Sequence, residues 1–487
     1  MDLVTPALSR GLRDLLPAEM IPRQRLIDAV RGVYELYGFV PVSTPAIEYL
    51  SVLSGSAGND AQKSIFKVQG PDAEPLGLRF DLTVPLARLI AQYPDLPRPF
   101  RRYQVAPVWR ADKPGPGRFR EFTQFDLDSV GVPSEVADTE IVAGMCDSLA
   151  AIQCGPYQVR FSSRRVLNLL MPFAGIDQSL AADVFRVLDK LEKIGPDKVR
   201  RELTTGYMDE SGDRIEGVGL TAEQVDRIQH FLAIKAETRD DVLAGLRGVF
   251  AGVAGADEAI AELAAISGHL AALGYREDRA VIDLTIARGL AYYTGPVFEA
   301  ILLDAPEFGS VFGGGRYDDL VMRFLGERVP ATGASMGVDR LLAALVKLGR
   351  AGARKSTAEV LVTVIDPALM GECLQMAFEL RRAGVAAELY LGSERGLGKQ
   401  IKHADRSGIP LALLYGADEH AKAVVTLKDL DVGKAKAQAM HDHAEWRQLR
   451  PGQFEVSRAD LVRAVKEITA ARTTRKGGSA GTDRELP

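Results

Sequence analysis

The sequence predicts an α+β protein with an antiparallel sheet domain, which is interrupted by a block of helices and followed by a small α/β domain. Three observations predict this architecture. Strand-like runs dominate the first part of the chain, helical runs fill residues 170–275, and strands alternate with helices from residue 359 onward. The chain of 487 residues is also long enough for roughly two or three domains.

The first domain begins with a predicted helix over residues 21–37, whose apolar side chains recur at helical spacing. Gly38 stands where a helix C-cap glycine is common, and residues 39–42 continue as an extended segment. Strands are expected over residues 100–109, 122–130, 280–286 and 297–303. Because no regular helices are expected between them, the sheet should be largely antiparallel.

The middle block contains predicted helices over residues 167–173, 181–194, 197–203, 222–234 and 256–273. It separates two sheet-like halves, so we interpret it as an insertion into a domain that covers residues 1–350. Residues 351–358 are the expected linker and residues 359–470 the α/β domain. The polar, glycine-rich residues 471–487 are expected to be a disordered tail.

The composition excludes several classes of protein. A net charge of −5 gives no overall signal for nucleic-acid binding, although a local basic patch would be sufficient. The cysteines form no CxxC pair, so a disulfide framework or a cysteine-rich zinc site is not expected, and a reducing compartment fits best. The sequence shows no secretory signal and no apolar run of membrane-spanning length. We therefore expect a cytoplasmic protein without membrane contact.

The most informative segment is a basic hairpin. Residues 101–120 hold six basic side chains and one acidic one, Asp112. The basic ones are Arg101, Arg102, Arg110, Lys113, Arg118 and Arg120. Arginines on a strand–loop–strand hairpin can fork around a triphosphate. The second strand places Phe122, Gln124, Asp126 and Asp128 on one face, toward a pocket. A solvated basic hairpin with unrelated acidic neighbours is the alternative.

Three glycine-rich segments accompany the hairpin. Residues 288–295 read RGLAYYTG, in which the glycines permit a ligand to approach the backbone and the tyrosine hydroxyls could bind a polar side chain. Tyrosine pairs of this kind also occur in cores and interfaces. Residues 313–318 read GGGRYD; they lack the context of a P-loop or dinucleotide fold, and we expect the glycines to form a turn under the active site. Residues 333–342 read as a strand followed by a helix start. There Arg340 opposes the helix dipole and needs an anion, which is either the γ-phosphate of ATP or an internal carboxylate.

None of the six histidines lies in these segments. A Ser-His-Asp hydrolase or a histidine-ligated metal enzyme therefore has no support in the sequence.

Together these segments resemble class II aminoacyl-tRNA synthetases, and the histidyl family in particular. Residues 38–45 look like motif 1, residues 110–128 like motif 2 and residues 333–342 like motif 3. RGLxYYTG and GGGRYD are the family-specific signatures, and residues 11–17 and 78–83 also match. The C-terminal α/β domain looks like the anticodon-binding domain of this family. The resemblance thus implies the class II synthetase fold.

The resemblance also implies roles for individual residues. Arg110 and Arg288 would be the catalytic residues, beside the α-phosphate and the substrate carboxylate. The residues implied for ATP binding are Arg110, Asp112, Arg118, Phe122 and Arg340. Those implied for histidine binding are Asp81, Thr83, Arg110, Gln124, Asp128, Arg288, Tyr292, Tyr293 and Tyr317. Asp81, Thr83 and Gln124 would take the α-amino group, and Asp128 with the tyrosines would read the imidazole.

The implied ligands and partners are ATP with Mg²⁺, L-histidine, tRNA(His) and a second copy of the chain in a homodimer, with no metal bound by the protein itself. One departure is Ala291, where the family usually has Asp. The family's motif 2 loop often carries Gln before its Gly-Arg, whereas residues 111–118 here contain no side-chain amide. We therefore expect little dependence on the extra 5′ guanosine of tRNA(His).

Two other classes remain as alternatives. One is a non-catalytic relative such as the regulatory subunit of ATP phosphoribosyltransferase, but such proteins usually lack the anticodon-binding domain and the ATP-gripping arginines. The other is a class II synthetase for prolyl, threonyl or glycyl transfer, and the RGLxYYTG segment disfavours it.

Overall fold

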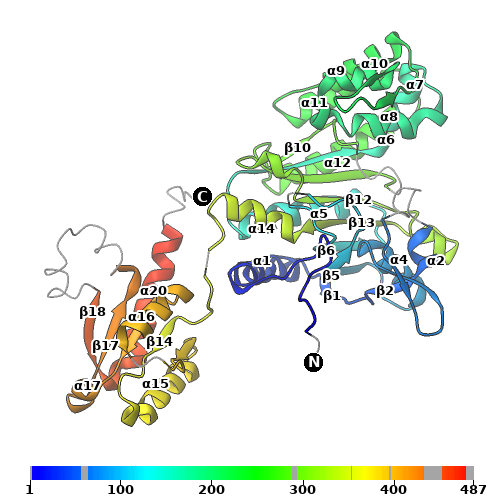
Figure 1. Ribbon diagram of the computed structural model, residues 1–487. Helices are drawn as coiled ribbons and strands as arrows, with labels where there is room; N and C mark the ends of the chain where they lie inside the picture. Colours follow the sequence, from blue (N-terminus) through cyan, green and yellow to red (C-terminus); the bar gives the residue numbers. More distant parts are fainter. Residues whose placement is uncertain are drawn as a thin grey trace. The chain divides into compact units, whose positions relative to one another are not determined.

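The computed structural model describes residues 3–55, 64–115, 117–287, 293–352, 354–393, 396–432 and 452–478. The chain divides into two compact units (Figure 1). The first comprises Met1–Asp14 and Arg23–Ala351, and the second comprises Leu15–Pro22 and Gly352–Pro487. Among the described residues, no helix combines the length and the apolar character needed to cross a membrane.

The first unit is built on an eight-stranded sheet with the order β1-β5-β6-β13-β12-β11-β7-β10. Its strands, in chain order, are β1 Val40–Pro41, β5 Phe100–Trp109, β6 Glu121–Val130, β7 Tyr157–Ser163, β10 Ala280–Ile282, β11 Pro296–Leu302, β12 Phe312–Arg316 and β13 Ala331–Gly337. All neighbours from β5 to β7 are antiparallel, and only the two outer pairs, β1–β5 and β7–β10, are parallel. The predicted antiparallel sheet is therefore confirmed.

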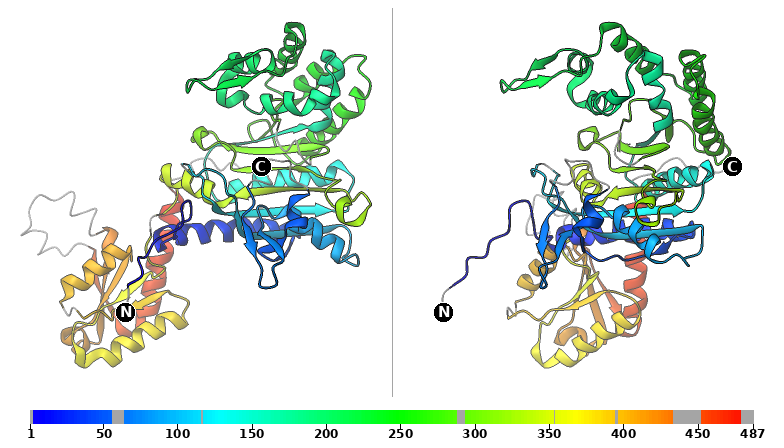
Figure 2. Two further views of the ribbon diagram at one scale, coloured as in Figure 1. Left: turned by 45° about the vertical axis from the view of Figure 1, so that its right-hand side comes forward. Right: turned by 90° about the vertical axis from the view of Figure 1, so that its right-hand side faces the viewer.

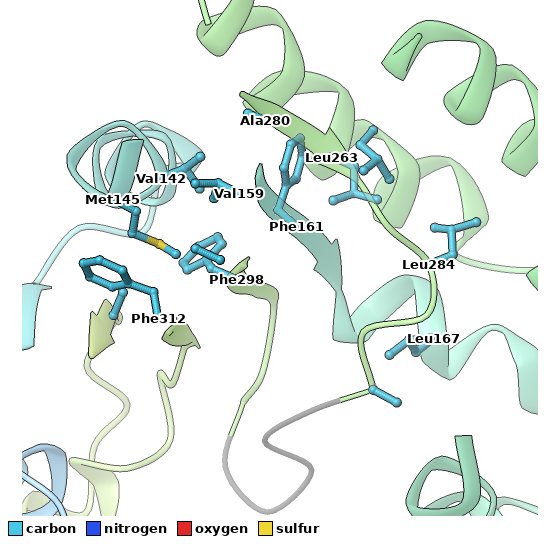
Figure 3. Packing of buried hydrophobic residues seen from close by; sticks show 14 of the residues in the cluster. Val142, Met145, Val159, Phe161, Leu167, Leu263, Ala280, Leu284, Phe298 and Phe312 are labelled. Atoms are coloured by element: carbon cyan, nitrogen blue, oxygen red, sulfur yellow. The ribbon is translucent and has the colours of Figure 1, made fainter. Parts of the chain in front are cut away.

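Helices α1 (Pro17–Leu36), α5 (Glu135–Ala151) and α14 (Val338–Lys347) belong to the same core as the sheet. Phe161, Phe298 and Phe312 of neighbouring strands pack beside Val142 and Met145 of α5 (Figure 3). We predicted no regular helices between the strands, and this prediction was wrong at α5, which lies between β6 and β7. This helix is buried on most sides, so its sequence lacks the one-sided apolar stripe by which a surface helix is recognised.

A smaller three-stranded sheet, in the order β2-β4-β3, lies in the N-terminal part of this unit. It is formed by β2 Ile47–Tyr49, β3 Lys67–Gln69 and β4 Pro75–Leu78. Short helix α2 (Leu50–Ser54) packs on it, and α2 in turn contacts α4 (Thr83–Gln92). Residues 79–82 connect β4 to α4, so this small sheet positions the segment that carries Asp81.

The insertion is largely helical, as predicted, and its helices form one group (Figure 2). They are α6 Arg164–Asn168, α7 Leu170–Ala174, α8 Ala181–Leu188, α9 Leu191–Leu203, α10 Ala222–Leu232, α11 Arg239–Val249 and α12 Ala256–Ala272. Helix α11 and a small hairpin, β8 (Gly206–Met208) with β9 (Arg214–Glu216), were not predicted. Helix α12 joins the insertion to the large sheet, because it contacts both α5 and β7.

The second unit holds a five-stranded sheet with the order β15-β14-β16-β17-β18. Its elements are β14 Val360–Val362, α15 Met370–Arg382, β15 Ala387–Leu389, α16 Leu397–Ser407, β16 Leu411–Leu414, α17 Ala417–Ala421, β17 Val424–Asp429, β18 Gln453–Ser457 and α20 Leu461–Gly478. Strands β15, β14 and β16 are parallel, and β17 and β18 are antiparallel additions. The predicted α/β domain is confirmed.

The predicted disordered tail was wrong for its first residues. Helix α20 continues to Gly478, whereas residues 479–487 lie outside the described part of the chain. Leu461 and Val465 are buried in the core of the second unit, and Ile468 packs against it. A helix anchored in this way extends into polar sequence, because propagation beyond a formed turn requires little free energy.

Candidate active site

A cavity of about 730 Å³ lies on the large sheet of the first unit. It brings together every described residue that the sequence predicted for ATP or histidine binding. These are Asp81, Thr83, Arg110, Asp112, Arg118, Phe122, Gln124, Asp128, Tyr293, Tyr317 and Arg340. Arg288 and Tyr292, with Ala291 between them in the same segment, lie outside the described residues.

Strand β6 supplies the central row of side chains. Phe122, Gln124, Asp126 and Asp128 all line the cavity, whereas Phe125 and Leu127 point into the hydrophobic core. Successive side chains of a strand point to opposite faces, so this alternation follows from the pleat. The predicted direction of the polar row agrees with the structure.

Basic side chains from two segments line the cavity: Arg110, Lys113 and Arg118 from the loop between β5 and β6, and Arg340 from α14. The Arg110 Nε donates to the Phe80 carbonyl oxygen at 3.0 Å, and its guanidinium carbon lies 5.2 Å from the centre of the Phe122 ring. Arg340 lies in the first turn of α14, where its Nη1 donates to the Ser310 carbonyl oxygen at 2.8 Å. This concentration of guanidinium groups suits a polyphosphate.

The N-terminal segment braces this basic region from behind. The Arg120 amide donates to the Gly11 carbonyl oxygen at 2.9 Å, and the Arg13 guanidinium lies 3.9 Å above the Phe119 ring. Arg13 also forms an ion pair of 3.0 Å with Asp339, whose second oxygen accepts the Thr123 amide at 2.6 Å. Residues 11–17 were matched in the sequence without a role; the structure shows that Gly11 and Arg13 hold the hairpin loop and the start of α14.

Polar side chains from other elements also line the cavity. Asp81 Oδ1 accepts the Val84 amide at 3.0 Å at the start of α4, and Thr83 is the first residue of that helix. Burial raises the pKa of the Asp81 carboxyl above its usual range. The Gln124 amide nitrogen donates to Ser335 Oγ on β13 at 2.9 Å.

Asp128 is held from two sides. The Tyr317 hydroxyl donates to its Oδ1 at 2.5 Å, and the Arg102 guanidinium lies 2.8 Å from its Oδ2. Burial raises the pKa of Asp128, while Arg102 and the bond from Tyr317 act in the opposite direction. The sequence placed Arg102 among the basic residues of the hairpin but gave it no site role. Its cross-strand pairing with Asp128 is the signal that such reasoning could have used.

The glycines of GGGRYD do not form the predicted turn; they lie in strand β12. A Cβ on Gly315 would come within 2.7 Å of the Pro296 carbonyl oxygen, and one on Gly314 would overlap the backbone of β13. The glycines are therefore needed for the close approach of neighbouring strands, which is a separate use of glycine from a turn. Arg316 of the same segment serves the fold, because it pairs with buried Asp138 at 2.6 Å.

The helical insertion also reaches the cavity. Arg186 and Asp189 at the end of α8 belong to its lining, which the sequence did not indicate.

An antiparallel sheet that carries a basic hairpin, followed by a strand–helix unit with an arginine in its first turn, defines the catalytic domain of a class II aminoacyl-tRNA synthetase. The comparisons with known proteins then identify the particular family. A family model described as histidyl-tRNA synthetase matches residues 11–341, and one described as anticodon binding domain matches residues 359–468.

Individual relatives agree with these matches. The chain is 46% identical to a histidine–tRNA ligase of Paracoccus denitrificans over 479 residues, which cover 94% of this chain and 96% of the relative. It is 44% identical to a histidine–tRNA ligase of Caulobacter vibrioides, with the same coverage of both chains. The crystal structure of histidyl-tRNA synthetase from a Nostoc species has a TM-score of 0.81 and 33% identity, covering 96% of this chain and all of that one. This chain belongs to the histidyl-tRNA synthetase family, as its sequence predicted.

Proposed function

We propose that this protein activates L-histidine with ATP to form histidyl-adenylate and then transfers the histidine to tRNA(His). One observation carries the proposal: described residues that were matched to the two substrates from sequence alone line a single cavity. They come from the β5–β6 hairpin, the segment before α4, the start of α4, the start of α14 and the segments that carry Tyr293 and Tyr317. The match of both units to the parts of one enzyme family supports the same reaction.

The basic side of the cavity accounts for the activation step. The substrate carboxylate is ionised at neutral pH, so its attack on the α-phosphate requires no general base. The enzyme's task is to align the two reactants and to stabilise the negative charge that develops at phosphorus. In our proposal Arg110 and Arg288 perform this task at the α-phosphate, Arg340 holds the γ-phosphate, and Mg²⁺ enters as part of the nucleotide substrate.

The acidic side of the cavity accounts for the choice of amino acid. Asp128 would accept an imidazole N–H, with Tyr317 and Arg102 fixing its orientation. A site built to hydrogen-bond a polar group rejects analogues that leave its own buried groups unpaired. Asp81, Thr83 and Gln124 would hold the α-amino group, and Tyr293 would complete the pocket around the ring.

The proposal also covers the macromolecular partners of the protein. In our proposal the second unit binds the anticodon of tRNA(His), residues 38–45 contribute to a homodimer interface, and the protein acts in the cytoplasm. The regulatory-subunit alternative is disfavoured because Arg110, Arg118 and Arg340 all line the cavity, and because residues 359–468 match an anticodon-binding domain.

The test is ATP–pyrophosphate exchange with each amino acid in turn, followed by aminoacylation of tRNA(His). We expect exchange that depends on histidine and charging of tRNA(His) alone. Exchange that depends on proline, threonine or glycine would show that this amino acid, and not histidine, is the substrate. A folded protein without exchange activity for any amino acid would favour the non-catalytic alternative.

A further inference from the structure

Asp126 is a buried carboxylate in the cavity for which the family resemblance supplied no role. It lies on the same face of β6 as Gln124 and Asp128 and lines the cavity between them. Same-face positions along a strand are about 6.7 Å apart, so Asp126 lies between the side chains assigned to the two ends of histidine. Only 1% of Asp126 is exposed, so any partner of its carboxylate must come from the protein or from a bound ligand.

The two carboxylates of this row differ in what they contact. Asp128 Oδ1 accepts the Tyr317 hydroxyl, and Asp128 Oδ2 lies 2.8 Å from the Arg102 guanidinium without a well-aligned hydrogen bond. Asp126 Oδ2 lies 3.7 Å from Arg102, whereas its Oδ1 has no hydrogen-bond partner within the described part of the chain. A buried acceptor without a partner destabilises the fold, and because Asp126 lines the cavity, a ligand bound there can supply the missing donor.

Arg102 provides the charge balance for this pair. It is completely buried and contacts both carboxylates, and its Nη2 also donates to the Leu82 carbonyl oxygen at 3.1 Å. With both acids ionised, Arg102, Asp126 and Asp128 together carry one net negative charge. A pocket of that charge favours a ligand that donates N–H groups and carries partial or full positive charge.

We propose that Asp126 is a second carboxylate of the amino-acid pocket, which binds the substrate's ring as imidazolium: Asp128 accepts one ring N–H and Asp126 Oδ1 accepts the other, with Arg102 as the counter-ion of Asp126. The inference rests on the proposed activity toward histidine. Asp126 binds substrate directly, whereas Arg102 acts through the two carboxylates and is a positioning residue.

The environment of Asp126 makes its contribution dependent on pH. Burial raises the pKa of Asp126 to about 7, with Arg102 opposing the shift and Asp128 adding to it. Charged and polar groups surround Asp126: Arg79, Arg102, Asp81, Asp128, Ser335, the hydroxyls of Tyr34 and Tyr317, and Gln104, which pairs with Asp126 across β5 and β6. In the free enzyme Asp126 is therefore protonated at acidic pH and accepts hydrogen bonds with both oxygens only above neutrality.

The experiment compares histidine-dependent ATP–pyrophosphate exchange in wild type, Asp126→Asn and Asp126→Glu. Loss of a hydrogen bond to a charged group should raise the KM for histidine by roughly tenfold or more in Asp126→Asn, with the KM for ATP within about twofold of wild type. Asp126→Glu keeps the charge and should recover part of the loss. Asp147→Asn is the matched control, because Asp147 is a partly buried carboxylate that accepts the Tyr37 hydroxyl at 2.7 Å outside the cavity.

The ratio of the mutant KM to the wild-type KM should approach one at pH 6 and rise through pH 7. We use the ratio because the titration of histidine itself affects both enzymes equally and cancels. The thermal stability of Asp126→Asn separates a binding role of Asp126 from a structural one. Because the folded pKa of Asp126 lies above its unfolded value, the ionised carboxyl lowers stability above pH 7. Asp126→Asn should therefore unfold at or above the wild-type temperature at pH 8, and a large decrease would assign Asp126 to the fold instead.

Imidazolepropionate, which has the ring and the carboxylate but no α-ammonium group, identifies the contacted group by competition. If Asp126 binds the ring, the inhibition constant of imidazolepropionate should rise in Asp126→Asn by the same factor as the KM for histidine. A rise for histidine alone would place Asp126 at the α-ammonium group and overturn the imidazole contact. An unchanged KM in an active mutant overturns the inference, whereas a wild-type protein without histidine-dependent exchange overturns the proposed function.

Discussion

Gly333→Ala tests whether close approach of strands β6 and β13 positions Asp128, which we propose reads the imidazole. Gly333 pairs with Asp128 across these strands. An added Cβ would overlap Asp128 Oδ1 and would come within 2.6 Å of both Asp128 Cγ and the Leu127 carbonyl oxygen. Ordinary contact begins near 3.4 Å, so Asp128 Oδ1 must move by about 1.4 Å or rotate away, and the backbone at Leu127 must shift by about 0.8 Å.

The displacement determines the expected magnitude. It breaks the 2.5 Å bond from Tyr317 and disturbs the pairing with Arg102. Loss of one hydrogen bond to a charged group corresponds to about 1.5–3 kcal/mol, which is roughly a 10- to 150-fold rise in the KM for histidine. Overpacking should also lower the stability of the fold by about 1–3 kcal/mol.

The assay is ATP–pyrophosphate exchange with histidine and ATP varied separately, accompanied by thermal unfolding. The KM for ATP should change little, because the basic side of the cavity does not contact Gly333. Gly32→Ala on helix α1 is the control, since a Cβ there meets no heavy atom within 4 Å. A folded Gly333→Ala enzyme with a wild-type KM for histidine would refute the positioning of Asp128 through this strand contact.

Three further predictions concern other parts of the enzyme. Arg288→Ala should reduce exchange by about 10²–10³-fold without unfolding the protein, and near-normal exchange would remove Arg288 from the mechanism. A chain that ends at residue 354 should still activate histidine but charge tRNA(His) poorly, provided it remains folded; equal charging would give the second unit another role. Because residues 111–118 contain no side-chain amide, tRNA(His) with and without the extra 5′ guanosine should be charged with kcat/KM values within about tenfold of each other.

The fold was predictable where local sequence reflects local surroundings. Strand β5 begins and ends as expected, and α1 ends before Gly38, whose φ of +77° fits a helix C-cap. Helix α5 was missed because its burial on most sides removes the apolar stripe. The glycines of β12 were misread as a turn because sequence alone does not tell whether a glycine serves a turn or a close approach of backbones.

The site was predictable only as far as family signatures reached. Those signatures named residues that we expect to touch ATP or histidine, and all the described ones line the cavity. They did not name Arg102 or Asp126, whose importance depends on which residues face each other across β5 and β6. Arg102 is paired with Asp128 through strand register, a relation between residues far apart in the chain.

The buried carboxylates of the cavity lower the stability of the fold. Burial raises the pKa values of Asp81, Asp126 and Asp128, which means that their ionisation at neutral pH works against folding. A hydrophobic row on β6 would be more stable, but it would accept apolar amino acids of similar size. Arg102 offsets part of this loss of stability by neutralising one carboxylate, and a substrate that donates N–H groups offsets the rest. In our proposal, the same buried charges that lower the stability of the empty enzyme make its pocket selective for histidine.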